Sequence, residues 1–331
     1  MIVQTIAVDI GGTYARFAVA EVAGGRVTAM HNPITMKVSE HASFQLAWQA
    51  FAEEVGKPMP RAAAIAMACP IDGDVLKLTN NPWIIRPALI PEKLNVEAWT
   101  LVNDFGAIAH AVTQLDEKQL VLVGGPDRPL PDDGVISVIG PGTGLGVAQI
   151  LRRNGQYHVM ECEGGHIDFA PLDSLEDEIL QYLRQRHNRV SVERVISGPG
   201  LSNIYEALVS VEGMTVEAIE NTKLWELAVN NKDSLAAAAL DRFCLSLGSV
   251  AGDIALAQGA KAVVIAGGIA PRIAHFLSRS GFIERFVAKG RFARMMTEIP
   301  IRLITHPQPG LYGAAAAFAD KYTANNYNQS G

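Results

Sequence analysis

The amino-acid sequence predicts an α/β protein of two lobes, each built from a mixed β-sheet flanked by helices. The chain has 331 residues, which is enough for two lobes with separate hydrophobic cores. A pattern of strand, glycine turn and strand at residues 2–22 occurs again at residues 136–148. A further apolar strand, within residues 262–269, ends in Gly-Gly before a helical segment. The repeated pattern predicts one such hairpin in each lobe.

The first glycine turn, residues 11–13 (Gly-Gly-Thr), lies between strands predicted at residues 2–8 and 16–22. Backbone N–H groups in such a turn can approach an anion closely, because glycine has no Cβ and tolerates positive φ. Asp9 adds a carboxylate beside the turn, and a Mg²⁺ ion would relieve its repulsion of a phosphate. The turn therefore indicates a phosphate-binding loop, and an ordinary hairpin with a solvated aspartate is the alternative.

The second glycine turn, residues 140–146, has the sequence Gly-Pro-Gly-Thr-Gly-Leu-Gly. Leu145 stands where a dinucleotide-binding fingerprint has its third glycine, and the turn leads into a strand instead of a helix. The chain also lacks the Walker P-loop sequence G-x-x-x-x-G-K-[ST]. The two turns therefore predict a duplicated phosphate-binding device with a nucleotide between the lobes, and Gly267-Gly268 would line an adenosine pocket.

Between the two turns, predicted strands alternate with predicted helices. Residues 26–38 continue the first sheet, and residues 43–55 place apolar side chains on one helical face. Residues 62–69 are a compact apolar run, typical of a buried strand, that ends at Pro70. The loop at residues 80–83, Asn-Asn-Pro-Trp, is either a plain turn or a contact for a polar ligand.

Asn103 and Asp104 end a strand that begins at residue 100, and residues 105–112 then have a helical pattern. Asparagine and aspartate are both favoured helix N-caps, so a purely structural role is a strong alternative. One residue is enough to cap a helix, however, and the pair leaves a carboxylate at the carboxyl end of a strand. Ligands of α/β sheets bind at that edge, which makes Asp104 a candidate site residue.

The segment 161–169 follows the second hairpin and contains Glu163, a Gly-Gly turn and His166. A carboxylate and an imidazole so close in sequence can converge on one small polar ligand. Taken alone, His166 is more typical of a hydrogen-bonded structural histidine, and Asp168 of a capping or salt-bridging residue. Glu193, in a later loop, is either a ligand or a first-turn helix acid.

The rest of the chain is mostly helical in pattern. A helix begins at residue 174, another at about residue 201, and a long core helix covers residues 234–258. A strand at residues 299–305 and an alanine-rich helix at residues 309–322 close the chain. We expect one lobe to comprise residues 1–113 and 306–331, and the other residues 114–305.

Composition narrows the class of protein. The net charge of −6 argues against nucleic acid as a partner, because no basic stripe offsets it. The three cysteines, Cys69, Cys162 and Cys244, have no metal-ligand spacing and fit a reducing compartment. We expect no signal peptide, and the long apolar helix contains charged residues that suit a core helix better than a membrane span. These features predict a cytoplasmic protein without membrane contact.

The three glycine-tipped strands resemble the actin/hexokinase/Hsp70 ATPase superfamily, whose two-lobed fold is actin-like (ribonuclease H-like). With its other motifs, the whole chain resembles the proteobacterial type of the glucokinase family. The matching motifs, in order, are DIGGT-x-AR (9–16), A-x-ACPI-x-GD (66–74), LTN-x-x-W (78–83), NDF (103–105), GPGTGLGVA (140–148), EGGHIDFAP (163–171), ERVISGPGL (193–201), IAGGI-x-PR (265–272) and KGRF (289–292).

This resemblance implies ATP-dependent phosphorylation of D-glucose at O6, with Mg²⁺, in a cytoplasmic and often homodimeric enzyme. It implies that Asp104 is the general base and that Asp9 reaches Mg²⁺ through phosphate or water. The sugar-binding residues implied by the resemblance are Asn103, Asp104, Glu163, His166 and Glu193. The nucleotide-binding residues it implies are Val8, Asp9, Ile10, Gly11, Gly12, Thr13, Gly142, Thr143, Gly267 and Gly268.

Two positions depart from the family pattern. Tyr14 replaces the usual Asn after Gly-Gly-Thr, and Val8 stands where a Gly is often found. Neither change removes a carboxylate or a backbone donor. The zinc-binding Cys/His cluster of related repressor/kinase sugar kinases has no counterpart in the sequence, so we expect no structural zinc. A kinase for another hexose, or an ATP-driven switch that phosphorylates no sugar, remains an alternative function.

Overall fold

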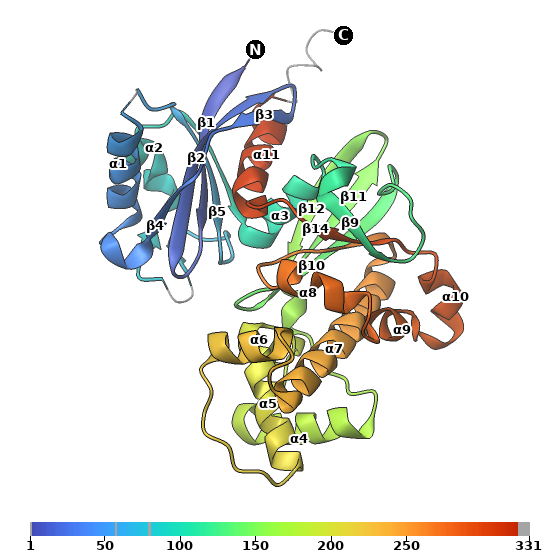
Figure 1. Ribbon diagram of the computed structural model, residues 1–331. Helices are drawn as coiled ribbons and strands as arrows, with labels where there is room; N and C mark the ends of the chain where they lie inside the picture. Colours follow the sequence, from blue (N-terminus) through green and yellow to red (C-terminus); the bar gives the residue numbers. More distant parts are fainter. Residues whose placement is uncertain (1, 57, 79–80, 324–331) are drawn as a thin grey trace. The chain divides into compact units, whose positions relative to one another are not determined.

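The computed structural model describes residues 2–56, 58–78 and 81–323 (Figure 1). The chain divides into two compact units, which we call the first unit (Met1–Asp116 with His306–Gly331) and the second unit (Glu117–Thr305). The boundary drawn from the sequence, after residue 113, lies three residues before the boundary after Asp116. Thr79 and Asn80, two residues of the LTN-x-x-W motif, lie outside the described residues.

The first unit contains a mixed sheet with the strand order β3-β2-β1-β5-β8, and β4 also pairs with β2. β1 is antiparallel to β2 but parallel to β5, and β5 is parallel to β8. The carboxyl ends of three parallel strands therefore share one edge of this sheet. The strands are β1 (Val3–Ile10), β2 (Tyr14–Ala23), β3 (Arg26–Met30), β4 (Ile34–Lys37), β5 (Ala62–Met67) and β8 (Ala98–Asn103).

Helices cover both faces of the first sheet (Figure 1). The buried aromatic side chains of α1 pack on one face, and Ala314 and Phe318 of α11 pack on the other face. Gly313 of α11 lies so close to α3 that an added Cβ would be 1.7 Å from the carbonyl oxygen of Ala107. The remaining elements are α1 (Phe44–Val55), α2 (Ile90–Leu94), α3 (Asp104–Val112), α11 (Pro309–Thr323), η1 (Val38–Glu40), η2 (Pro87–Leu89), β6 (Leu76–Lys77) and β7 (Ile84–Ile85).

The second unit repeats the strand arrangement of the first. Its sheet has the order β12-β11-β10-β13-β14-β9, with β10 antiparallel to β11 and parallel to β13. The predicted α/β fold with a glycine-tipped hairpin in each unit is therefore confirmed. The strands are β9 (Leu120–Gly124), β10 (Gly134–Pro141), β11 (Leu145–Arg153), β12 (Gln156–Cys162), β13 (Ala260–Ile265) and β14 (Ile301–Ile304).

The long helix α7 forms the centre of the second unit's core. It is the one described helix that is long and apolar enough to span a membrane, but 67% of its apolar window is buried inside the protein. Gly248 and Gly252 allow α9 to pack closely against it. The helices are α4 (Ser174–His187), α5 (Gly198–Val211), α6 (Asn221–Val229), α7 (Ser234–Gln258), α8 (Ala270–Leu277), α9 (Phe282–Val287), α10 (Ala293–Met296), η3 (Glu117–Gln119), η4 (Gly164–His166), η5 (Val192–Arg194) and η6 (Gly290–Phe292).

Two sequence-based expectations need correction. The strand expected at residues 26–38 consists of β3, β4 and the start of a 3₁₀ turn. The helix expected to begin near Leu201 begins at Gly198, because Ser197 caps it by accepting a hydrogen bond from Gly200 N–H at 3.1 Å. Pro199 occupies the first turn of this helix, where its missing N–H costs nothing. Gly198, Pro199 and Gly200 therefore form the first turn of α5 and do not belong to a loop.

Candidate functional site

The first glycine turn connects β1 to β2, whose last paired residues are Ile10 and Ala15. Gly11 N–H donates to the Tyr14 carbonyl at 3.0 Å, and Asn81 donates from its amide to the Gly11 carbonyl at 2.9 Å. Neither glycine of this turn has a positive φ, so the turn does not use the left-handed conformation that glycine tolerates. Glycine is favoured at position 11 by close approach, because an added Cβ would lie 3.3 Å from the Tyr14 oxygen.

Asp9 lies next to this turn, with 20% of its side chain exposed. Burial raises the pKa of its carboxyl group, and the charge and hydrogen bond of Arg16 lower it by less. The Asp9–Arg16 pair is long, at 3.5 Å. Asp9 also packs against the start of α11, where a Cβ on Gly310 would lie 3.0 Å from Oδ2. A weakly compensated carboxylate of this kind suits a hard divalent cation such as Mg²⁺.

Asn103 is the N-cap of α3, and Asp104 is the first residue of that helix. The Asn103 side-chain oxygen accepts hydrogen bonds from Phe105 N–H at 2.9 Å and Gly106 N–H at 3.4 Å. Its amide donates to the Cys69 carbonyl at 3.2 Å. One oxygen of Asp104 accepts a bond from Phe105 N–H at 3.0 Å. Capping is therefore mainly the task of Asn103, and Asp104 follows it as a half-buried carboxylate in the first turn of α3.

Sheet register brings these residues of the first unit to one edge. Ile10 of β1 pairs with Met67 of β5, and Met67 pairs with Asn103 of β8. Asp104 also lies near enough to Cys69 to affect the thiol. Burial raises the pKa of the Cys69 thiol, and the negative charge of Asp104 raises it further by a smaller amount. The first glycine turn and the Asp104 carboxylate therefore lie at the same edge of the sheet, as expected for a ligand site.

In the second unit, the second glycine turn and the Gly267-Gly268 pair lie side by side. Gly267 has a φ of +84°, and an added Cβ would lie 2.4 Å from the Pro141 carbonyl oxygen. Ile269 N–H donates to that same carbonyl at 3.2 Å. A third segment joins them, because Gly198 N–H at the start of α5 donates to the Gly142 carbonyl at 2.7 Å. The contact of Gly198 with the second glycine turn was not predicted from the sequence, although the motif Ser-Gly-Pro-Gly at residues 197–200 was a signal for it.

Glu163 and His166 lie in the turn that follows β12. Glu163 Oε2 and His166 Nε2 are 3.8 Å apart, and their side chains are 66% and 57% exposed. The Gly-Gly pair between them is required by packing, since a Cβ on Gly165 would lie 2.0 Å from the Leu145 carbonyl oxygen. Asp168 forms an ion pair with Arg189 at 2.7 Å, which confirms its expected salt-bridging role.

Glu193 also contacts Leu145. It lies in the 3₁₀ turn η5, half-buried, and its Oε2 accepts a hydrogen bond from Leu145 N–H at 2.9 Å. The segment that carries Glu163 and the segment that carries Glu193 are linked, because Val192 N–H donates to the Ile167 carbonyl at 2.9 Å. The second unit therefore gathers Glu163, His166 and Glu193 around the start of β11.

The residues that depart from the family pattern lie in different environments. Val8 is fully buried in the core of the first unit, so its side chain serves packing. Tyr14 is 42% exposed at the start of β2 and pairs in register with Lys37 of β4.

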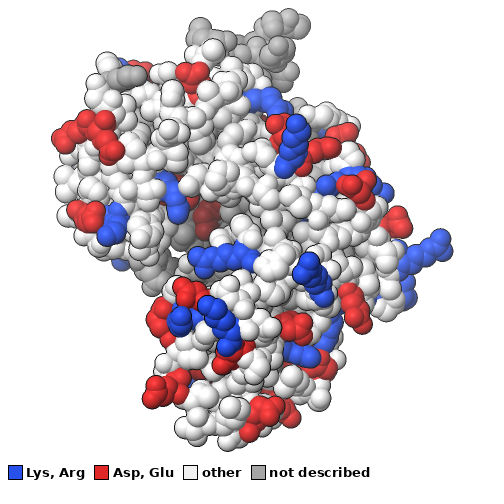
Figure 2. Space-filling model, viewed as in Figure 1, with Lys and Arg blue, Asp and Glu red and all other residues white. Residues whose placement is uncertain are grey.

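Figure 2 shows acidic and basic side chains interspersed on the visible face. Among residues that the structure describes, no group of three or more His, Cys, Asp or Glu side chains is placed to hold a metal.

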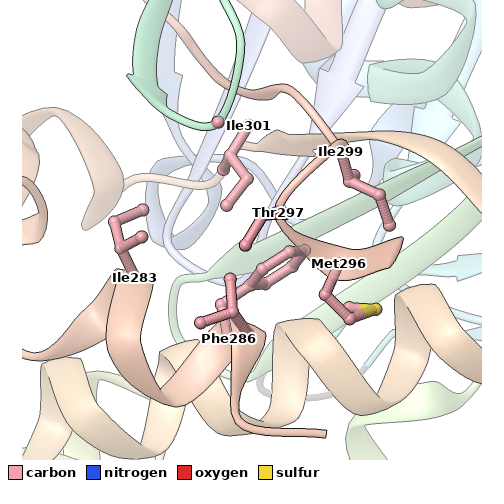
Figure 3. A pocket seen from close by; sticks show the side chains of 8 residues that line it. Ile283, Phe286, Met296, Thr297, Ile299 and Ile301 are labelled. Atoms are coloured by element: carbon pink, nitrogen blue, oxygen red, sulfur yellow. The ribbon is translucent and has the colours of Figure 1, made fainter. Parts of the chain in front are cut away.

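A cavity of about 150 Å³ lies in the second unit away from these residues (Figure 3). Figure 3 shows apolar side chains pointing into it from α9, α10 and β14. None of the predicted site residues lines it. Phosphoryl transfer needs convergent polar groups, so this cavity is not the candidate site. Its lining residues are Gly125, Ile283, Phe286, Val287, Met296, Thr297, Ile299 and Ile301.

Comparison with known proteins places these motifs in one family. A family model described as glucokinase matches residues 6–321. The glucokinase of Zymomonas mobilis is 61% identical over 320 residues, which cover 97% of this chain and 99% of the relative. That of Caulobacter vibrioides is 41% identical over 313 residues, covering 93% of each chain. A crystal structure of glucokinase from an Antarctic psychrotroph has a TM-score of 0.83 at 34% identity, covering 95% of this chain and 98% of the other.

Proposed function

This chain belongs to the glucokinase family, and we propose that it transfers the γ-phosphoryl group of ATP to O6 of D-glucose, giving glucose 6-phosphate and ADP. The family match over residues 6–321 carries this conclusion. The structure contributes a carboxylate at the carboxyl edge of a parallel sheet, beside a glycine turn, in the first unit.

Asp104 is proposed as the general base. As O6 attacks the γ-phosphorus, the bond from that phosphorus to the β,γ-bridging oxygen breaks, ADP leaves, and the O6 proton passes to an oxygen of Asp104. Asn103 supports this role because it satisfies the N–H groups of α3 and holds the strand end against Cys69. The Asp104 carboxylate is therefore fixed by the backbone without having to cap the helix alone.

Glu163, His166 and Glu193 are proposed to bind the other sugar hydroxyls, together with Asn103. A hydroxyl both donates and accepts, so carboxylates and an imidazole match a ring of hydroxyls well. Bonds to ionised acceptors are also the stronger ones. The grouping of the three side chains around the start of β11 supports this role.

The nucleotide-binding residues are proposed to be the two glycine turns and the Gly267-Gly268 segment. Backbone N–H groups of the two turns would supply the hydrogen-bond donors that phosphate oxygens require. A bound Mg²⁺ would neutralise phosphate charge, and Asp9 is the described carboxylate suited to hold it, through phosphate or water. The family resemblance further supports a cytoplasmic homodimer without structural zinc, and these three features remain proposals.

The decisive assay is ADP release by the purified protein over a panel of hexoses, with the phosphorylated product identified. We expect glucose to stimulate ADP release by at least about a hundredfold over water, as sugar-induced activation requires. Faster turnover of mannose or of an N-acetylated sugar than of glucose would favour the alternative that the protein is a kinase for another hexose. ATP turnover that is indifferent to every sugar would contradict the proposal and favour an ATP-driven switch.

A further inference from the structure

One hydrogen bond in the second unit joins a residue proposed for sugar binding to a turn proposed for phosphate binding. Leu145 N–H, at the end of the second glycine turn, donates to Oε2 of Glu193 at 2.9 Å. A carboxylate has two oxygens with about four lone-pair sites, so this bond leaves Oε1 able to accept from a sugar hydroxyl. The same side chain can therefore contact both the turn and the sugar.

Gly144 makes this bond possible. A Cβ at that position would lie 2.3 Å from Oε2 and 3.1 Å from the carboxyl carbon of Glu193. Gly144 is not among the glycines with positive φ, so the backbone conformation itself would accept alanine. Position 144 therefore requires glycine because the Glu193 carboxylate occupies the space of a side chain.

The other end of the turn is held by the same segment that carries Glu193. Gly198 N–H, five residues after Glu193, donates to the Gly142 carbonyl at 2.7 Å. Inside the turn, Gly142 N–H donates to the Gly144 carbonyl at 2.8 Å. Residues 193–198 thus hold the turn at Gly142 and at Leu145, and a shift of this segment would move both ends of the turn together.

We propose that the segment 193–198 couples glucose binding to nucleotide binding, and that Gly144 is a positioning residue for Glu193. This inference rests on the proposed function, in which Glu193 contacts glucose and the turn contacts phosphate. A sugar bound to Glu193 immobilises the carboxylate that orients Leu145 N–H, and the turn is then ordered for phosphate. By thermodynamic linkage, nucleotide must strengthen glucose binding by the same factor as glucose strengthens nucleotide binding.

The test is a double-mutant cycle on glucose affinity, measured by calorimetry with and without a non-hydrolysable ATP analogue. We expect the analogue to tighten glucose binding to the wild-type protein by fivefold or more, within the usual range of coupling between sites. In Gly144→Ala the carboxylate must withdraw by about 1 Å to reach ordinary contact, which breaks a bond of normal length. Glucose should bind at least about tenfold more weakly to this variant, and the coupling should fall below twofold.

The double variant separates the proposed route from a general effect on the turn. With Glu193→Ala there is no carboxylate to displace, so adding Gly144→Ala should change glucose affinity by less than twofold. If Gly144→Ala alone fails to fold, the double variant should recover folding, and its failure to do so would overturn the inference. Gly73→Ala is the matched control, since its Cβ meets no atom nearer than 3.9 Å and its φ is not positive.

Two failures are distinguishable. If the wild-type protein shows no glucose-dependent ADP release, the proposed function itself is wrong. If it phosphorylates glucose but the penalties of Gly144→Ala and Glu193→Ala multiply, position 144 does not act through Glu193, and the inference alone is wrong. If the coupling between glucose binding and nucleotide binding persists in Glu193→Ala, the inference alone is also wrong.

Discussion

Asn103 makes two separate contributions to the stability of the first unit: it caps α3, and it holds the backbone at Cys69. Its oxygen caps two N–H groups of the helix, and its amide donates to the Cys69 carbonyl. Loss of an N-cap costs about 1 kcal/mol, and loss of one further hydrogen bond costs about another 1 kcal/mol. Asn103→Ala should therefore lower the free energy of unfolding by about 2 kcal/mol. Asn103→Ser keeps a capping oxygen but loses the amide donor, and should lower it by about 1 kcal/mol.

Urea unfolding followed by tryptophan fluorescence measures this series, because Trp48, Trp83 and Trp99 lie in the first unit. Ser43→Ala is the matched control, since Ser43 caps α1 through one bond of 3.3 Å to Leu46 N–H. It should cost about 1 kcal/mol and leave kcat unchanged. Asn103→Ala should instead also raise KM for glucose. An alanine variant within 0.5 kcal/mol of wild type, or a serine variant as unstable as alanine, would refute this account of the strand end.

Two further predictions concern acid stability and Mg²⁺. Burial lowers the pKa of His110 to about 4, below its value of about 6.5 in an unfolded chain, so the unfolded state binds more protons between these pH values. Stability should fall by about 3 kcal/mol through this residue as the pH falls from 6.5 to 4. Urea titrations at several pH values should show a shallower loss in His110→Gln, and an unchanged slope would exclude His110 as the cause. Gly310→Ala places a Cβ 3.0 Å from Asp9 Oδ2 and should raise the Mg²⁺ concentration for half-maximal activity several-fold. An unaltered Mg²⁺ titration would contradict the prediction that the position of the Asp9 carboxylate affects Mg²⁺ binding.

The sequence was most informative where a pattern has one physical reading. Glycine turns between β-rich runs predicted both hairpins, and the helix α7 has the predicted bounds, Ser234–Gln258. The helix signal at residues 43–55 was equally direct, because Ser43 is a strong N-cap and precedes a regular apolar face. Local chemistry is enough to determine such elements.

The sequence was least informative where distant segments decide the local structure. Gly144 looks like any turn glycine until the fold places Glu193 against it, and Gly310 looks like a helix-start glycine until Asp9 lies beside it. The role of Asn81 has the same origin, since its bond partner, Gly11, is 70 residues away. Among the site glycines, Gly267 has a positive φ and Gly11 does not, and the sequence alone does not distinguish the two.

The central claim is that Asp104 accepts the O6 proton of glucose, and the Asp104→Asn variant tests it most directly. Asparagine keeps the size and one acceptor oxygen, so glucose affinity should change by less than about threefold, while loss of a general base should lower kcat by about 10²-fold or more. Both quantities follow from steady-state kinetics and calorimetric glucose binding on the same preparation. A variant with normal affinity and a hundredfold lower kcat is the predicted result. Near-normal turnover would mean that Asp104 merely begins α3 and that the proposed mechanism is wrong.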